Sequence, residues 1–166
     1  NYNKPGCIAF MTDKGYWNQR ARGMGGRITS CAEENLLGYP GTRYYGENIT
    51  VHEFSHNLMS AIEKIDQPLY QRILSAYQSA KEKGMYKVQY AINTADEYWA
   101  KGTQGSFWSN FHFTDTGRNI TLWSPASLKV YDPVLYQILS EVYIGHHNPA
   151  DAYYKTHYTP GANSSH

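Results

Sequence analysis

The sequence has few charged residues and no long apolar run. Only 17% of its 166 residues are Asp, Glu, Lys or Arg, the formal net charge is +1, and no block of like charges occurs. Proteins that bind nucleic acids or membrane surfaces usually display such a block. No apolar stretch approaches the roughly 18–20 residues that cross a bilayer. We therefore expect neither nucleic acid nor a membrane among the partners of this chain.

Cysteine is also scarce, since only Cys7 and Cys31 are present. The even number of cysteines, the low charge and the 16 tyrosines favour a secreted protein with one Cys7–Cys31 disulfide. Closing a loop of that size contributes roughly 3–4 kcal/mol in the chain-entropy model. The alternative is two free buried thiols in a cytosolic protein. Three sequons also favour secretion and predict N-glycans at Asn48, Asn119 and Asn163.

Nothing in the sequence divides the chain, because it contains neither an internal repeat nor a linker. With 41% hydrophobic residues, a chain of this length can bury a core as a single domain. The first residues are polar, so we expect that any signal peptide has been removed. The last twenty residues, about 147–166, are rich in Tyr, His, Asn and Pro and predict a surface tail.

Hydrophobic periodicity predicts an α+β fold, with strands only in the first half and helices dominating the second half. The glycines of RGMGG, residues 22–26, predict a turn. Before and after it, we expect short strands over residues 5–10 and 27–31. Apolar stripes, caps and prolines predict four helices, at about residues 50–65, 67–83, 94–110 and 132–145.

The segment ENITVHEFSHNLMSAIEK, residues 47–64, contains an HExxH pattern formed by His52, Glu53 and His56. On a helix, two histidines four residues apart point in the same direction and can bind one metal ion. Glu53 lies about 100° further round the helix, from where it can reach a water molecule without binding the metal. This is the chemistry of zinc hydrolases, in which the metal activates water and the glutamate acts as general base.

The same residues also permit a structural interpretation. Thr50 and Glu53 have the spacing of a capping box, in which the glutamate bonds back to the start of the helix. His52 and His56 would then be ordinary histidines. By composition, an HExxH pattern occurs by chance in roughly one of fifty to a hundred sequences of this length, so the motif needs a third ligand to support it.

The third metal ligand has to come from another segment. The continuation NLMSAIEKID lacks the glycine and third histidine of metzincins, whereas the segment AINTADEYWAKGTQGSF, residues 91–107, offers Glu97 on a predicted helix. Thr94 and Glu97 again fit a capping box, which is the alternative role for this glutamate. Asp96 is the nearest competitor as a ligand, and Glu33 and Glu34 are weaker ones.

HEFSH, followed by Tyr90 seven residues before Glu97 and then by EYWA, resembles the gluzincin zinc metallopeptidases, which include the catalytic domain of anthrax lethal factor. The resemblance covers roughly residues 22–144. It implies a zincin-like fold and a zinc ion (Zn²⁺) bound by His52, His56 and Glu97. It also implies Glu53 as general base and Tyr90 as donor to the oxyanion of a peptide or protein substrate.

One position departs from the family pattern. Four residues after the ligand, the family has an acidic residue, and this chain has Lys101. A carboxylate there orients a metal-binding histidine, and a lysine cannot accept that hydrogen bond. Either another acidic or carbonyl group accepts it, or the metal is held more loosely and activity is low. The first hypothesis is therefore a secreted zinc endopeptidase. The alternative is a catalytically weak or inactive zincin-like metal-binding protein that acts as a toxin, defence or binding protein. A third is a helical protein with a fortuitous HExxH.

Overall fold

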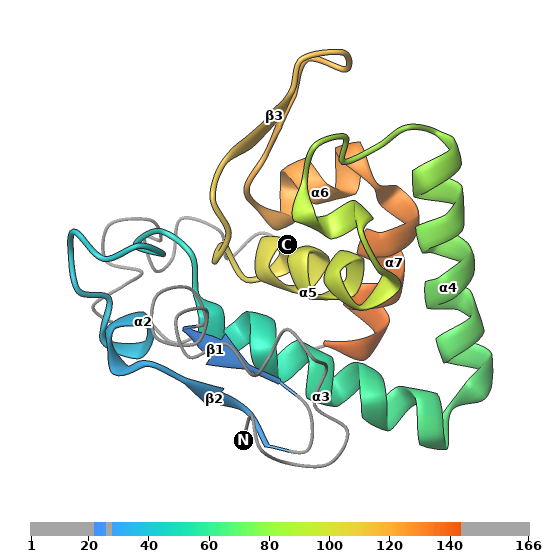
Figure 1. Ribbon diagram of the computed structural model, residues 1–166. Coiled ribbons are helices and arrows are strands. Elements are labelled where there is room, and N and C mark those ends of the chain that lie inside the picture. Colours follow the sequence, from blue (N-terminus) through green and yellow to red (C-terminus); the bar gives the residue numbers. More distant parts are fainter. Residues whose placement is uncertain (1–21, 26–27, 144–166) are drawn as a thin grey trace.

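The computed structural model describes residues 22–25 and 28–143 (Figure 1). This part of the chain contains six α-helices, one 3₁₀ helix and two small antiparallel sheets, which agrees with the predicted α+β class. The strand expected at residues 5–10 and the tail expected at 147–166 lie outside the described residues. Among the helices that the structure describes, none combines the length and apolarity of a membrane span.

The elements follow one another in an order that places most helices after residue 48. The chain runs through β1 (Gly23–Met24), β2 (Ser30–Cys31), α2 (Glu33–Leu37), α3 (Ile49–Ile65), α4 (Gln67–Glu82), the 3₁₀ helix η2 (Tyr90–Ile92), α5 (Ala95–Ser106), β3 (Phe113–Asp115), β4 (Ile120–Leu122), α6 (Pro125–Tyr131) and α7 (Pro133–Val142).

The two small sheets confirm one expectation drawn from the sequence and correct two others. Strand β2 lies within the strand expected over residues 27–31. Gly23 and Met24 form strand β1, antiparallel to β2, where the glycines of RGMGG predict a turn. The hairpin of β3 and β4 lies in the second half of the chain, where no strand is expected, and Asn119 adopts the left-handed conformation at its turn (φ 53°). Strands of two or three residues are too short to show the alternation that identifies a strand in a sequence.

Helix α3 begins one residue earlier than predicted. Its N-cap is Asn48, whose side chain accepts a hydrogen bond from the Val51 amide at 3.1 Å. Thr50 therefore lies inside the first turn, and its hydroxyl oxygen is 2.9 Å from the Cys31 sulfur. The capping box of Thr50 and Glu53 is not formed, so the Glu53 carboxylate is available for another role.

Helix α5 lies in the middle of the molecule, between α3 on one side and α6 and α7 on the other (Figure 1). Thr94 caps it by accepting from the Glu97 amide at 3.2 Å. The helix ends earlier than the predicted residue 110, because Trp108 turns left-handed (φ 51°) and the Ser109 amide bonds back to the Gln104 carbonyl oxygen at 2.9 Å. Trp99, fully buried, donates from its indole nitrogen to the Ser55 carbonyl oxygen of α3 at 3.1 Å.

A buried aspartate ties the helices together on the far side of α5. Asp132 caps α7 by accepting from the Leu135 amide at 3.1 Å. Its second carboxylate oxygen accepts from the hydroxyls of Tyr98, at 2.7 Å, and Tyr86, at 3.2 Å. Burial and the charge of Asp132 raise the pKa of both tyrosines, so they remain neutral donors. This predicted N-cap therefore also joins α5 to α7.

Candidate metal centre

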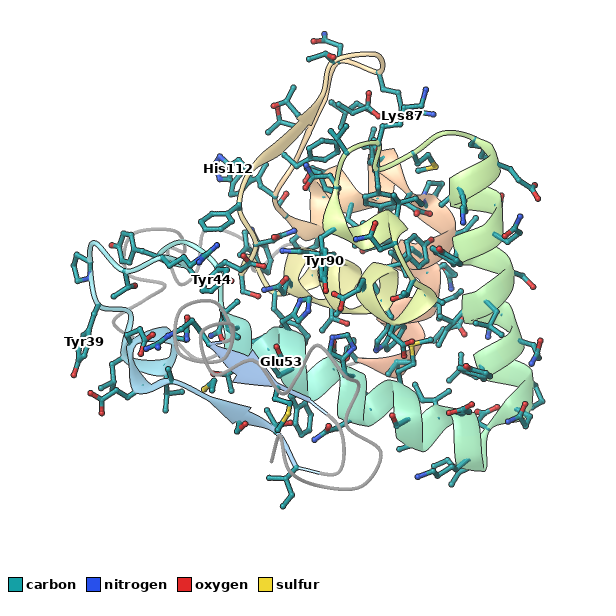
Figure 2. All side chains as sticks on the ribbon, in the orientation of Figure 1. Tyr39, Tyr44, Glu53, Lys87, Tyr90 and His112 are labelled. Carbon is teal, nitrogen blue, oxygen red and sulfur yellow. The ribbon has the colours of Figure 1, made fainter. Side chains whose placement is uncertain are left out.

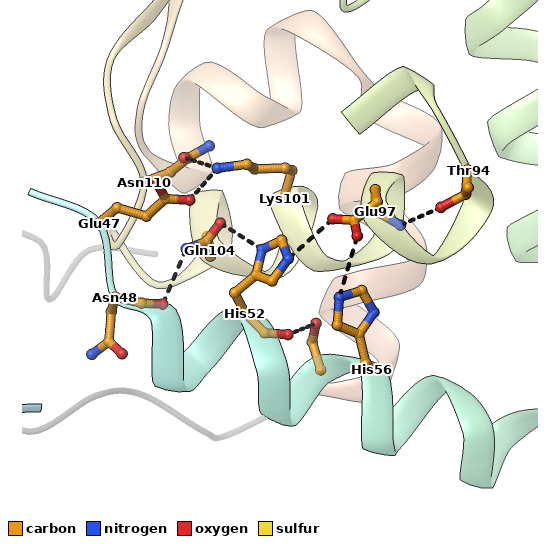
Figure 3. Close-up of polar contacts among 10 residues, drawn as sticks. Glu47, Asn48, His52, His56, Thr94, Glu97, Lys101, Gln104 and Asn110 are labelled. Atoms are coloured by element: carbon orange, nitrogen blue, oxygen red, sulfur yellow. Dashed lines mark hydrogen bonds and ion pairs between the residues drawn. The ribbon is translucent and has the colours of Figure 1, made fainter. Parts of the chain in front are cut away.

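The structure brings together the three side chains that the sequence selects as metal ligands. His52 and His56 lie one turn apart on α3, and Glu97 lies opposite them in the first turn of α5 (Figure 3). One Glu97 oxygen is 3.0 Å from His52 Nε2, and the other is 3.7 Å from His56 Nε2. One ligand atom from each of the three residues can be chosen so that all lie within 4.8 Å of one another, and the group could therefore hold a metal ion.

The local chemistry of Glu97 fits a cation at this place. Its Oε2 is buried without a hydrogen-bond donor and faces His52 Nε2. The carboxylate oxygen and an unprotonated imidazole nitrogen each point an electron pair at the other. Their contact is therefore favourable only if a proton or a metal ion lies between them. Two imidazole nitrogens and one carboxylate, with a further position open, are the donor set of many catalytic zinc sites. Glu97 thus reaches the histidines with its side chain while its amide takes part in the helix cap.

The electrostatics of the two histidines differ. Burial lowers the pKa of His52, but the close contact with Glu97 and the negative charge of that carboxylate outweigh it and leave the pKa raised. His56 has a lowered pKa because burial and the charge of His52 exceed the influence of Glu97. The side chain of His52 is 9% exposed and that of His56 is 18% exposed, so both groups are largely shielded from water but open to one side.

Glu53 lies beside the three-residue group, against strand β1. Burial raises the pKa of its carboxyl, while the charge of His52 and a hydrogen bond from the Gly25 amide oppose this rise. A Cβ atom at Gly23 would lie 2.7 Å from Glu53 Cγ, and one at Gly25 would lie 2.5 Å from the Glu53 carbonyl oxygen. The close approach of β1 to this glutamate therefore requires glycine at both positions.

A cavity of about 440 Å³ extends in front of these residues. Its wall includes His52, Glu53, His56, Tyr90 and Glu97. These are the five residues that the sequence selects as metal ligands, base and oxyanion donor. Tyr90, on η2, is 58% exposed, and it lines the cavity from the side of α5, whereas Glu53 lines it from α3 (Figure 2). A larger hollow of about 620 Å³ between α4 and α7 contains none of the candidate residues.

The competing carboxylates take no part in this group. Asp96 is exposed next to Glu97, and Glu33 is exposed on α2. Glu34 pairs with Arg22, whose Nη2 lies 2.5 Å from the glutamate oxygen. The choice of Glu97 as third ligand over these residues is thus the one that agrees with the geometry.

The contacts of Lys101 and Gln104 are not predicted from the sequence. Lys101 forms an ion pair with the buried Glu47 and donates to the Asn110 side-chain oxygen at 3.2 Å, in a direction that does not meet His52 (Figure 3). Instead, Gln104 contacts the His52 ring, with its side-chain oxygen 3.1 Å from Nδ1. Sequence reasoning missed Gln104, although it lies seven residues, or about two turns, after Glu97 on the same face of α5.

The structure describes only some of the residues for which a disulfide or an N-glycan is predicted. Cys31 is half-buried beside Thr50, and its expected partner Cys7 lies outside the described residues, so the disulfide stays a prediction. Asn48 is 6% exposed and caps α3, which disfavours a glycan there. Asn119 is exposed at the turn of a hairpin, and Asn163 lies outside the described residues.

Comparison with protein-family models, with curated proteins and with solved structures gives no match. The interpretation of the site therefore depends on its residues and their arrangement.

Proposed function

We propose that this protein is a secreted, zinc-dependent endopeptidase of the gluzincin type with a zincin-like fold. The observation that supports the proposal best is the meeting of His52, His56 and Glu97 at the wall of a cavity that Glu53 also lines. Catalytic zinc sites combine three protein ligands with an open position and a nearby base, whereas structural zinc sites have four protein ligands. No other ligand group of this kind occurs among the described residues.

Each residue has a defined task in this proposal. When bound, zinc supplies Lewis acidity, which makes a water molecule more acidic and polarises a carbonyl group. Glu53 takes the proton from the attacking water and later gives it to the leaving amine of the peptide. The Gly25 amide and the close packing of β1 hold the Glu53 carboxylate in position for this transfer.

Tyr90 supplies the remaining group that peptide hydrolysis needs. As the carbonyl carbon becomes tetrahedral, negative charge develops on its oxygen, and a hydrogen-bond donor stabilises that charge. The phenol of Tyr90 is exposed on the cavity wall, so it can reach a peptide that enters from solvent.

One observation favours the second candidate, a catalytically weak or inactive metal-binding protein. Lys101 lines the same cavity, and its positive charge opposes the rise in the pKa of His52 that Glu97 causes, so it disfavours a cation at that imidazole. Such a protein would retain the metal group as a binding or structural element and would act as a toxin, defence or binding protein.

Metal analysis and one variant separate these functions. We expect about one zinc per chain in the purified protein. Replacing Glu53→Gln keeps the size of the side chain but removes the base, so we expect peptide hydrolysis to fall at least about 100-fold while the zinc content is unchanged. Replacing both His52→Ala and His56→Ala should remove the zinc.

Three results would decide against parts of this proposal. A wild-type protein without zinc contradicts both candidates. A wild-type protein that binds zinc but cleaves no peptide in a diverse library supports the second candidate. Equal hydrolysis by wild type and the Glu53→Gln variant would show that Glu53 is not the base.

A further inference from the structure

His52 has two ring nitrogens, and the structure gives each a different neighbour. Nε2 faces Glu97 at the candidate metal centre. Nδ1 faces the side-chain oxygen of Gln104 at 3.1 Å, on the side of the ring away from the metal group (Figure 3). Gln104 is completely buried. A buried amide that contacts one ring nitrogen of an imidazole can determine which of the two nitrogens carries the proton.

The orientation of the Gln104 amide follows from its second contact. Its nitrogen donates to the Asn48 backbone carbonyl oxygen at 3.0 Å. A carbonyl oxygen only accepts, so the amide nitrogen has to face Asn48 and the amide oxygen has to face His52. The amide oxygen also only accepts, so His52 Nδ1 has to donate. In neutral His52 the proton is thus on Nδ1, and the electron pair of Nε2 points toward Glu97.

The contacts around Gln104 connect the two helices of the site. Asn48 is the N-cap of α3, the helix that contains His52, and Gln104 belongs to α5, the helix that contains Glu97. The Asn48 amide donates to the Ser109 carbonyl oxygen at 2.9 Å, and the Ser109 hydroxyl donates to the Gln104 carbonyl oxygen at 3.1 Å. These bonds form a closed network in which the Gln104 side chain has little freedom to turn away.

We propose that Gln104 is the positioning residue for His52: it holds the proton on Nδ1 and directs Nε2 toward the metal. This inference rests on the proposed zinc site. It assigns to an amide on the next turn of α5 the task that the Lys101 position does not perform, since Lys101 is paired with Glu47 and Asn110. The amide oxygen orients the imidazole without adding a negative charge to the site.

Two variants of Gln104 test the proposal, with a neighbouring variant as control. Gln104→Leu removes the acceptor at nearly constant volume, and Gln104→Glu keeps an acceptor facing Nδ1. Thr103→Val is the matched control, because Thr103 is also buried (2% exposed) and hydrogen-bonds through its side chain, at 3.3 Å, to the Tyr143 hydroxyl and not to His52. Circular dichroism and thermal unfolding check that each variant is folded.

The readouts are zinc affinity, by competition with a chelator, and the nuclear magnetic resonance signal of the His52 Nδ1 proton in the zinc-loaded protein. We expect wild type, Thr103→Val and Gln104→Glu to show a slowly exchanging Nδ1 proton. We expect Gln104→Leu to lose that signal and to bind zinc about 10–100-fold more weakly.

Several outcomes would overturn the proposal. Gln104→Leu could bind zinc as tightly as wild type and keep the signal, or Thr103→Val could weaken zinc binding as much as Gln104→Leu. If Gln104→Leu does not fold, the test depends on Gln104→Glu. Loss of the Nδ1 signal in a folded Gln104→Glu variant would then overturn the proposal. A wild-type protein that binds no zinc defeats this inference and the proposed function together. Zinc binding without peptide hydrolysis defeats the peptidase alone, and the Gln104 test then still applies.

Discussion

At the scale of single residues, the reactive side chains of the site depend on neighbours that perform no chemistry. Glu53 is held by the Gly25 amide, and strand β1 approaches it only because two glycines leave room. His52 is held by Gln104. The candidate base and the first candidate ligand therefore each have one supporting neighbour, the Gly25 amide just after β1 and Gln104 of α5.

Tyr90 offers a sharp test at this scale. Tyr90→Phe removes only the hydroxyl, so we expect kcat for peptide hydrolysis to fall by about 10²–10³-fold, as for the loss of one oxyanion donor, with little change in KM. Zinc content should not change, because the phenol is not among the three grouped ligands.

Tyr39→Phe is the matched control for that variant. Tyr39 is similarly exposed, at 45%, but it is not part of the cavity wall (Figure 2). Its variant should keep wild-type kcat. Unchanged kcat in Tyr90→Phe would remove Tyr90 from the mechanism and leave the other assignments intact.

At the scale of elements, the site exists because α3 and α5 pack closely along their length. The buried Trp99, two residues from Glu97 and from Lys101 along α5, joins the two helices through the Ser55 carbonyl oxygen. On its other face, α5 meets α7 at Gly102, where a Cβ atom would be 2.5 Å from Leu135 Cδ2. The position of α5 in the core thus depends on the small Gly102 on the face toward α7 and on the aromatic Trp99 that contacts α3.

Two glycines of α5 give opposite predictions for the same substitution. Gly102→Ala inserts a methyl group into a filled space, so we expect the free energy of unfolding to fall by about 1–3 kcal/mol. Gly105→Ala places its Cβ atom 3.9 Å from Leu128, an ordinary contact, and removes a flexible residue from a helix. We expect it to increase the free energy of unfolding by about 0.5–1 kcal/mol.

Denaturation with urea measures both changes under the same conditions. The two variants share one helix and one chemical change, so they differ mainly in the space around the new methyl group. Equal effects of the two substitutions would contradict the close packing of α5 on α7 at Gly102.

At the scale of the whole molecule, the candidate metal centre lies at the edge of the core. The large buried side chains include Tyr98 and Trp99 of α5 and Leu135 of α7, and the cavity opens on the side of α5 that faces α3 and β1. A metal ion in this position would connect two helices that are distant in sequence. Its binding should therefore stabilise the fold and not only the site.

Zinc should raise the melting temperature of the wild-type protein. With free zinc at 100 times its dissociation constant, binding to the folded state alone adds about 2.7 kcal/mol. For a chain of this size, that increment corresponds to a rise of about 5–11 °C. Differential scanning calorimetry of the metal-free and zinc-loaded protein measures the shift.

The Glu97→Ala variant serves as the reference for the thermal experiment. It lacks one of the three grouped ligands, so its melting temperature should respond to zinc far less than that of wild type. An equal rise in both proteins would mean that zinc acts at residues other than this group.

Features that depend on spacing within one helix could be predicted from the residues alone. The four-residue interval between His52 and His56 places both imidazoles on one face of α3, and the Asp132-Pro133 pair marks the start of α7. The sequence also limited the third ligand to a few carboxylates, Glu97 and its competitors Asp96, Glu33 and Glu34, because a fixed set of residue types binds zinc. These properties are local or chemical, and they do not depend on how the helices cross.

The neighbours that support those residues could not be predicted, because they depend on how the helices pack. Lys101 and Gln104 both follow Glu97 on the inner face of α5, and the spacing alone treats them alike. The packing of α5 on α3 directs Lys101 to Glu47 and Gln104 to His52. In the same way, the Gly25 amide, just after β1, donates to Glu53, and Asn48 rather than Thr50 is the N-cap of α3. Contacts between distant segments follow from the packing of the whole core, which no local pattern of residues encodes.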